Sequence, residues 1–263
     1  PQEISTLFLI VAMTLALTEI RLEGLRFRTE LRAFAAAFGW NYGILTGLAL
    51  VFASLTSDPD LRAGWVVMAA VPSAIAVVPL TSIFRGNVRS TLISTALLYG
   101  AALLLFPAIT LVFAGRTAPP INIATQTLLQ IGVPIAASRL LARIPAMERW
   151  RGTGVNLSFL VLVTVVAGAN RSAFGDPSLV LGLSLAGLLR TFGIGLLVAG
   201  LAWVLRRPRE DRIGWTLFAS FKNLGLTALL ALSLFGARAA IPAIVTLFYE
   251  ILWIVALQRL FKG

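Results

Sequence analysis

The sequence predicts an all-α polytopic membrane protein with nine transmembrane helices, and three observations support this fold class. Of its 263 residues, 58% are hydrophobic and only 13% are charged, whereas a soluble domain carries about 25% charged residues. Apolar runs of roughly 17 residues or more, enough to cross a bilayer, recur along the whole chain. Basic residues are dense in every second connection between these runs and sparse in the others. Helices satisfy the backbone of such lipid-facing segments internally.

The connecting charges set the orientation of the chain. Most basic residues lie in the connections of one side, and only Arg62, Arg116, Arg171 and Arg238 lie in those of the other. The positive-inside rule therefore places the N-terminus outside and the C-terminus in the cytoplasm of a cell membrane, which we expect to be a bacterial inner membrane. We place the spans at about 4–20, 33–54, 62–84, 89–114, 123–143, 155–170, 177–204, 213–236 and 239–259.

The order of the spans divides the chain into two related halves within a single transmembrane unit, 1–263. If the span at 123–143 is a connector, residues 1–115 and 155–263 each hold four spans. The two halves then begin on opposite sides of the membrane, as inverted repeats do.

The third span of each half is interrupted. In the first half it contains Pro72 and Pro79, and each proline breaks or kinks a helix. In the second half it contains Lys222 and Asn223, with small or polar neighbours. Paired interruptions at matching positions of inverted halves point to a transport site between two crossing, discontinuous helices.

Three ionisable residues lie near mid-membrane depth on separate spans. Arg190, Lys222 and Glu250 are each far from the charged connections at both ends of their spans. A charge at the centre of a span costs about 2.5–3.5 kcal/mol on insertion scales, so it normally faces protein or water and marks a function. We expect these residues to take part in the transport site, and a structural ion pair that fixes helix packing is the alternative.

The absence of two residue types excludes several classes of chemistry. The chain has no Cys and no His, which removes disulfides, thiol catalysis, imidazole ligands and the Ser-His-Asp triad. The loop carboxylates lack metal-ligand spacing, and no nucleotide-binding fingerprint is present. We expect no enzymatic activity, no metal, no other cofactor and no nucleic-acid partner, because the one-sided loop arginines account for the net charge of +11.

Two segments carry a family resemblance. Residues 71–97 read VPSAIAVVPLTSIFRGNVRSTLISTAL, and residues 218–232 read FASFKNLGLTALLAL. Both segments resemble regions of the bile acid:sodium symporter family, in which the matching residues are Pro72, Arg85, Gly86, Asn87, Thr91, Thr95, Asn223, Gly225 and Leu226. The resemblance implies alternating-access transport of organic anions. It also implies a core of spans two, three, four, seven, eight and nine beside a panel of spans one, five and six.

The departures from the family pattern concern sodium. Val77 and Val78 stand where the family has Ser-Asn, Phe218 stands where it has Glu, and Lys222 stands where it has Gln. Valine and phenylalanine side chains cannot ligate a cation. An ammonium would repel one, by roughly 4 kcal/mol at about 4 Å and an effective dielectric near 20. The resemblance therefore implies a carrier that has lost its sodium sites, with Lys222 as a built-in cation.

The first hypothesis is a sodium-independent carrier of a small or amphipathic organic anion, embedded in membrane lipid. In it, Lys222 holds the helix crossing or binds the substrate carboxylate, and Glu250 pairs with Lys222 or with Arg190. The alternatives are a proton-coupled carrier that uses Lys222 and Glu250, and a non-transporting membrane sensor with a degenerate site. The candidate substrate-binding or coupling residues are Lys222, Asn223, Arg190, Glu250, Thr91, Thr95, Asn41 and Ser220. The candidate crossing residues are Pro72, Val77, Val78, Pro79, Phe218 and Gly225.

Overall fold

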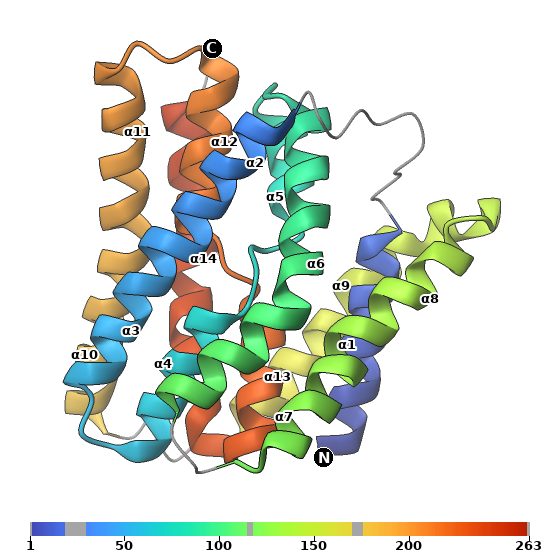
Figure 1. Cartoon of the computed structure of the whole chain (residues 1–263), viewed down its shortest axis with the longest axis vertical. Helices are drawn as coiled ribbons and strands as arrows, with labels where there is room; N and C mark the ends of the chain where they lie inside the picture. Colours follow the sequence, from blue (N-terminus) through green and yellow to red (C-terminus); the bar gives the residue numbers. More distant parts are fainter. Residues whose placement is uncertain (1, 19–29, 115–117, 170–175, 262–263) are drawn as a thin grey trace.

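Two helix breaks meet near the centre of a bundle of helices in the computed structural model (Figure 1). The structure describes residues 2–18, 30–114, 118–169 and 176–261, so the arginines at 21–28 lie outside the described residues. All regular structure in the described residues is helical, which confirms the all-α fold class.

The helices follow the order of the spans, the two halves and the connector that the sequence predicts, and the inverted repeat itself remains a prediction. The first half contains α1 (Gln2–Leu17), α2 (Leu31–Phe38), η2 (Gly39–Leu45), α3 (Thr46–Leu55), α4 (Pro59–Ala70), α5 (Val77–Ile83) and α6 (Val88–Phe113). The connector contains α7 (Pro120–Thr127), η4 (Leu128–Gly132) and α8 (Val133–Leu141). The second half contains α9 (Pro145–Ala169), α10 (Pro177–Leu188), η6 (Leu189–Gly193), α11 (Ile194–Val204), α12 (Arg209–Ser220), α13 (Leu224–Phe235), η7 (Ala237–Ala240) and α14 (Ile241–Leu260).

Several helical runs are suited to a membrane. Among the described residues, 5 runs are long and apolar enough to cross one: Leu31–Leu55, Val88–Phe113, Pro177–Val204, Arg209–Phe235 and Ala237–Leu260. The other predicted spans correspond to α1, the α4–α5 pair, the α7–η4–α8 run and α9. The chain is therefore a multi-pass membrane protein, and nine crossings remain a prediction.

Both predicted breaks are present, with limits that differ slightly from the positions of the prolines. The first break runs from Val71 to Ala76, between α4 and α5. Pro79 lies inside the first turn of α5. Its missing backbone N–H removes no helical hydrogen bond there, because the residue four positions earlier, Ile75, lies outside the helix. The second break is shorter and extends from Phe221 to Asn223, between α12 and α13.

A turn of π-helix interrupts the second span of each half. Asn41 lies in the first of these turns, η2, and Arg190 lies in the second, η6. Both side chains are fully buried. The extra residue of a π-turn rotates the following face of the helix, and such turns are frequent at functional sites. The two turns therefore direct one amide and one guanidinium into the protein interior.

Helices α1, α8 and α9 form one side of the molecule in Figure 1. Helix α1 packs along both α8 and α9, and these helices belong to the three spans that the family resemblance assigns to the panel. The broken helices lie among α2, α6, α10, α11 and α14 instead. Figure 1 also shows that α1 begins and α14 ends at opposite ends of the bundle.

Candidate functional site

The two breaks are joined by a backbone hydrogen bond. The N–H of Asn223 donates to the carbonyl oxygen of Pro72, at 3.0 Å. Phe221 is extended, so the chain leaves α12 without a further helical turn and reaches the first break. This contact places the C-terminal end of α4 beside the second break, where the carbonyls at the end of a helix carry partial negative charge.

The ammonium of Lys222 binds that end of α4. Its Nζ donates to the carbonyls of Ala69 and Val71 at 3.0 and 2.7 Å, and to Oγ1 of Thr46 at 3.1 Å. These three acceptors match the three donors of an ammonium. The Tyr42 ring adds a cation–π contact, with Nζ 4.6 Å from its centroid, and the lysine is only 1% exposed. The Lys222 side chain therefore joins the second break to the end of α4, and its three donors are used by protein oxygens.

The end of the other half-helix is bound by a neutral amide. Nδ2 of Asn41 donates to the carbonyls of Phe218 and Phe221, at 3.3 and 3.2 Å. Asn41 and Thr46 come from the same span, and Thr46 also donates to the carbonyl of Ala69 at 2.6 Å. One face of the second span thus satisfies the carbonyl ends of both α4 and α12.

Glu250 links the remaining predicted charges. Its Oε1 accepts from Nη1 of Arg190 at 2.8 Å and from the backbone N–H of Lys222 at 3.1 Å. The carboxylate therefore pairs with Arg190, as one version of the hypothesis states, and it contacts Lys222 through the backbone rather than through the ammonium. Because Arg190 is fully buried and Glu250 is nearly so, each needs the other as a counter-charge.

Asn223 begins the second half-helix. Its Oδ1 accepts the N–H of Leu226 at 3.0 Å, an N-cap of α13, and its Nδ2 donates to the hydroxyl of Tyr99 at 2.7 Å. Capping satisfies one of the free N–H groups at a helix start. Gly225 lies in the first turn of α13, at the wall of the cavity described below.

The other candidate residues have more ordinary surroundings. The Thr81 hydroxyl donates to Thr91 at 3.3 Å, and Ser220 accepts from the indole N–H of Trp253 at 3.0 Å. Oγ1 of Thr95 is buried without a hydrogen-bond partner among the described residues. The apolar crossing residues Val77, Val78 and Phe218 are buried and supply no side-chain oxygen.

A cavity of about 770 Å³ separates the two groups of helices at the crossing. Its lining includes Lys222, Asn223 and Glu250, which we predicted as site residues. The walls come from α1 and α9 on one side and from both breaks and α14 on the other. This is the position at which a core and a panel would share a substrate.

Sequence reasoning missed several residues of the site. Thr46 and Tyr42 bind the same α4 end as Lys222, and Arg149 and Arg151 line the cavity. A signal existed for Thr46, because it follows Asn41 on one span and both are polar. The arginines had been assigned only to a cytoplasmic connection, and their charge alone does not show that α9 packs beside a cavity.

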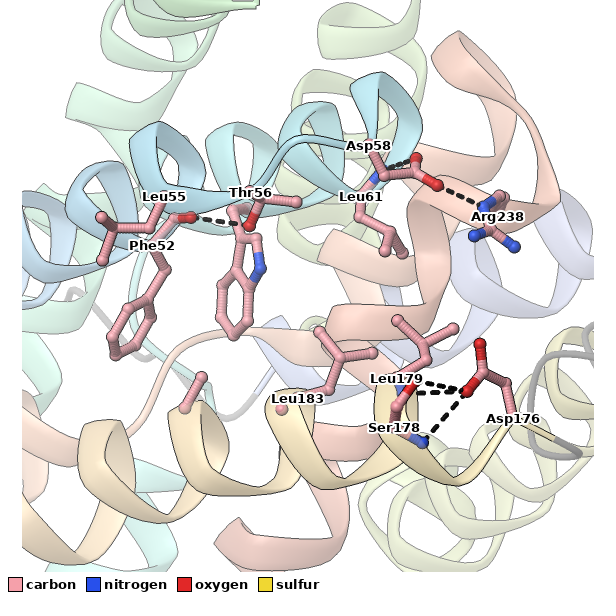
Figure 2. A pocket seen from close by; sticks show the side chains of 13 residues that line it. Phe52, Leu55, Thr56, Asp58, Leu61, Asp176, Ser178, Leu179, Leu183 and Arg238 are labelled. Carbon is pink, nitrogen blue, oxygen red and sulfur yellow. Dashed lines mark hydrogen bonds and ion pairs between the residues drawn. The ribbon is translucent and has the colours of Figure 1, made fainter.

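A second pocket of about 490 Å³ lies between α3, α4 and α10 (Figure 2). At its edge Arg238 donates to Oδ2 of Asp58, at 2.7 Å. Burial alone would raise the pKa of Asp58, but the Leu61 N–H and the Arg238 guanidinium outweigh it and hold that pKa below its ordinary value. Hydrogen bonds donated by the Ser178 hydroxyl and, to a smaller extent, by the Leu179 N–H likewise lower the pKa of Asp176. Asp58 caps α4 and Asp176 caps α10. We therefore interpret the charged residues of this pocket as structural and assign it no transport role.

Comparison with known families identifies the chain. A family model, described as the SBF-like CPA transporter family, matches residues 2–262. The chain belongs to this family. It is a family of membrane transporters related to the bile acid:sodium symporters, which confirms the resemblance seen in the sequence. A search among curated proteins finds no match.

Proposed function

We propose that the protein is a sodium-independent secondary transporter of an organic anion, with Lys222 in place of a sodium ligand. The observation that carries the proposal is the bonding of the lysine. Its ammonium occupies the carbonyl end of α4 at distances of 2.7 and 3.0 Å, in a position suited to a bound cation. A second cation about 4 Å away would be repelled by roughly 4 kcal/mol at an effective dielectric near 20.

The site shape supports alternating access. The cavity lies between α1 and α9 on one side and the two breaks on the other, so relative movement of these groups would change the side to which it opens. We assign residues 1–115 and 155–263 to inverted repeats around a connector at 123–143. The positive-inside rule then gives an outer N-terminus, a cytoplasmic C-terminus and, we infer, a bacterial inner membrane.

The test is uptake of an organic anion into proteoliposomes. Radiolabelled cholate and a set of smaller carboxylates are offered with an inward sodium gradient, and again with potassium in place of sodium. We expect equal initial rates in both salts for the transported anion. Strict dependence on sodium would reject the proposal, and the absence of flux with retained binding would favour the sensor alternative.

Proton coupling is the second candidate, because Lys222 and Glu250 both line the cavity. Buried groups that share a water-filled space can exchange a proton with it. If this is the mechanism, an inward proton gradient drives accumulation, and Lys222→Gln abolishes the effect of the gradient while downhill exchange continues. An unchanged response of the Lys222→Gln variant to pH would reject this version.

A further inference from the structure

Some of the charged side chains that line the central cavity are already bound by other protein groups, and others are not. Lys222 directs its three donors to protein oxygens, and Glu250 pairs with Arg190. The other charged residues of the lining are Arg149 and Arg151. Arg149 and Arg151 are therefore the two positive charges of this lining that no other described residue binds.

Both arginines lie near the beginning of α9, on the panel side of the cavity. Arg149 is exposed and Arg151 is half-buried. Neither has a hydrogen-bond or ion-pair partner in the part of the chain that the structure describes. A guanidinium offers five donors in a planar fork that fits carboxylates, sulfonates and phosphates, so two unpaired guanidinium groups at one cavity favour an anion.

Most of the remaining lining is apolar. It includes Leu9 and Met13 of α1, Ile75 of the first break, and Leu247 and Ile254 of α14. A ligand that fits this cavity has an apolar body and one anionic group. The apolar wall does not hold the charged group, and the lysine has no free donor for it.

We propose that Arg149 and Arg151 recognise the anionic group of the substrate at the exposed part of the cavity, and that Lys222 does not. This inference rests on the proposed function and deepens it, because it separates two roles that the sequence had assigned to one residue. Lys222 fixes the crossing, and the panel arginines select the charge of the ligand.

The absence of cysteine allows a direct test with a single introduced thiol. Ala76 is exposed and lines the cavity, so Ala76→Cys provides a reporter. Its rates of reaction with anionic sulfonatoethyl methanethiosulfonate and cationic trimethylammonioethyl methanethiosulfonate are measured on the purified protein. Each rate is divided by that of a free thiol. We expect the anionic reagent to be favoured, and Arg149→Gln with Arg151→Gln to lower the anionic-to-cationic ratio at least about tenfold.

The matched control is Arg143→Gln, because Arg143 is exposed just before α9 and is not among the residues that line the cavity. We expect it to leave the ratio unchanged. A ratio unaffected by the double substitution, or an equal fall with Arg143→Gln, would overturn the inference, and so would a thiol that neither reagent reaches. Labelling requires no transport, so a sodium requirement found in the uptake assay would reject the proposed function without altering this result.

Discussion

Lys222 stabilises the crossing by satisfying carbonyls that a broken helix leaves without partners. The carbonyls of Ala69 and Val71 lie at the end of α4, where no later turn of helix donates to them, and the lysine binds both. In lipid or in a protein interior, each such group left unbonded costs about 1–3 kcal/mol. The favourable interaction of a cation with a helix C-terminus adds to this.

Lys222→Gln removes the ammonium and shortens the side chain, so it leaves at least one of these carbonyls unbonded. We expect the melting temperature in detergent to fall by several degrees. Lys262→Gln, which removes the same charge near the end of the chain, serves as the control. Sodium chloride is expected to restore no more stability than potassium chloride, because Val77 and Val78 supply no side-chain ligand. A melting temperature equal to that of the control would contradict the bridging role.

For individual residues, the sequence predicts which ones are buried more readily than it predicts what they bind. The mid-span position of Lys222 predicted its burial, and the pairing of Arg190 with Glu250 was among the stated possibilities. The two carbonyl acceptors of Lys222 could not be predicted, because every residue carries a carbonyl and only the folded backbone shows which ones lack a partner. Arg149 resembles any other loop arginine until the packing of α9 is known.

At the scale of elements, the position of α4 depends on a very close helix contact. A Cβ atom added at Gly64 would overlap the carbonyl oxygen of Ala239 and would lie 3.2 Å from Cγ of Pro242. Backbone cannot yield as a flexible side chain does. Helix α4 therefore packs directly against the backbone that precedes α14, and this contact fixes where the carbonyl end bound by Lys222 lies.

Gly64→Ala is expected to destabilise the protein by more than the usual overpacking cost of about 1–3 kcal/mol. Gly100→Ala is the matched control, because a Cβ atom at Gly100 meets nothing within 4 Å. Thermal unfolding in detergent compares the two variants with the parent chain. If Gly64→Ala unfolds at the same temperature as Gly100→Ala, the close contact between α4 and the start of α14 is wrong.

The elements were predictable to the extent that they leave local signals. Pro72 predicted the first break, and Lys222 with its small neighbours predicted the second. The π-turns η2 and η6 were not predicted, because no residue type demands them, and a turn of this kind is retained when tertiary contacts compensate for it. The position of Asn41 in its span therefore did not predict that its side chain points into the protein interior, and only the structure shows this.

At the scale of the molecule, an ion pair joins the two halves at the end of the bundle that we assign to the outside. Asp58 precedes α4 in the first half, and Arg238 lies in η7 of the second half. Nε of Arg238 lies 2.7 Å from Oδ2 of Asp58 (Figure 2). The pKa of Asp58 is lowered in the folded protein, so the folded state binds this proton less readily than the unfolded chain does. The pair therefore contributes stability above the unfolded pKa of about 3.9, and that contribution is lost as the pH falls through the lower folded pKa.

Asp58→Asn should accordingly reduce the fall in melting temperature between neutral pH and pH 3. The expected effect is small, because Arg238 is half exposed and exposed pairs contribute little. Asp60→Asn removes a neighbouring carboxylate that makes no ion pair among the described residues. It should leave the pH dependence closer to that of the parent. Equal pH dependence in both variants would remove Asp58 as a source of acid sensitivity.

Alternating access would require the panel to move against the core, and a polar contact between η4 and α13 is one of those that join these groups. Nε2 of Gln130 in η4 donates to Oγ of Ser233 in α13, at 3.2 Å. Because the chain has no cysteine, Gln130→Cys with Ser233→Cys creates a single pair that a short bifunctional thiol reagent can join. A comparable pair within the panel is Leu15→Cys with Gly154→Cys, since a Cβ atom at Gly154 would lie 2.6 Å from Cδ1 of Leu15.

Cross-linking the Gln130–Ser233 pair is expected to stop anion uptake into proteoliposomes, and reduction of a cleavable linker is expected to restore it. The reason is mechanical, because a bond between η4 and α13 fixes the panel against a helix of the crossing. The Leu15–Gly154 pair joins α1 to α9, which would move together, so its cross-linking should leave the uptake rate unchanged. Uptake that continues through a fully cross-linked Gln130–Ser233 pair would mean that transport proceeds without relative motion of the two groups. The cavity at the crossing would then have to open by local movement of the broken helices alone.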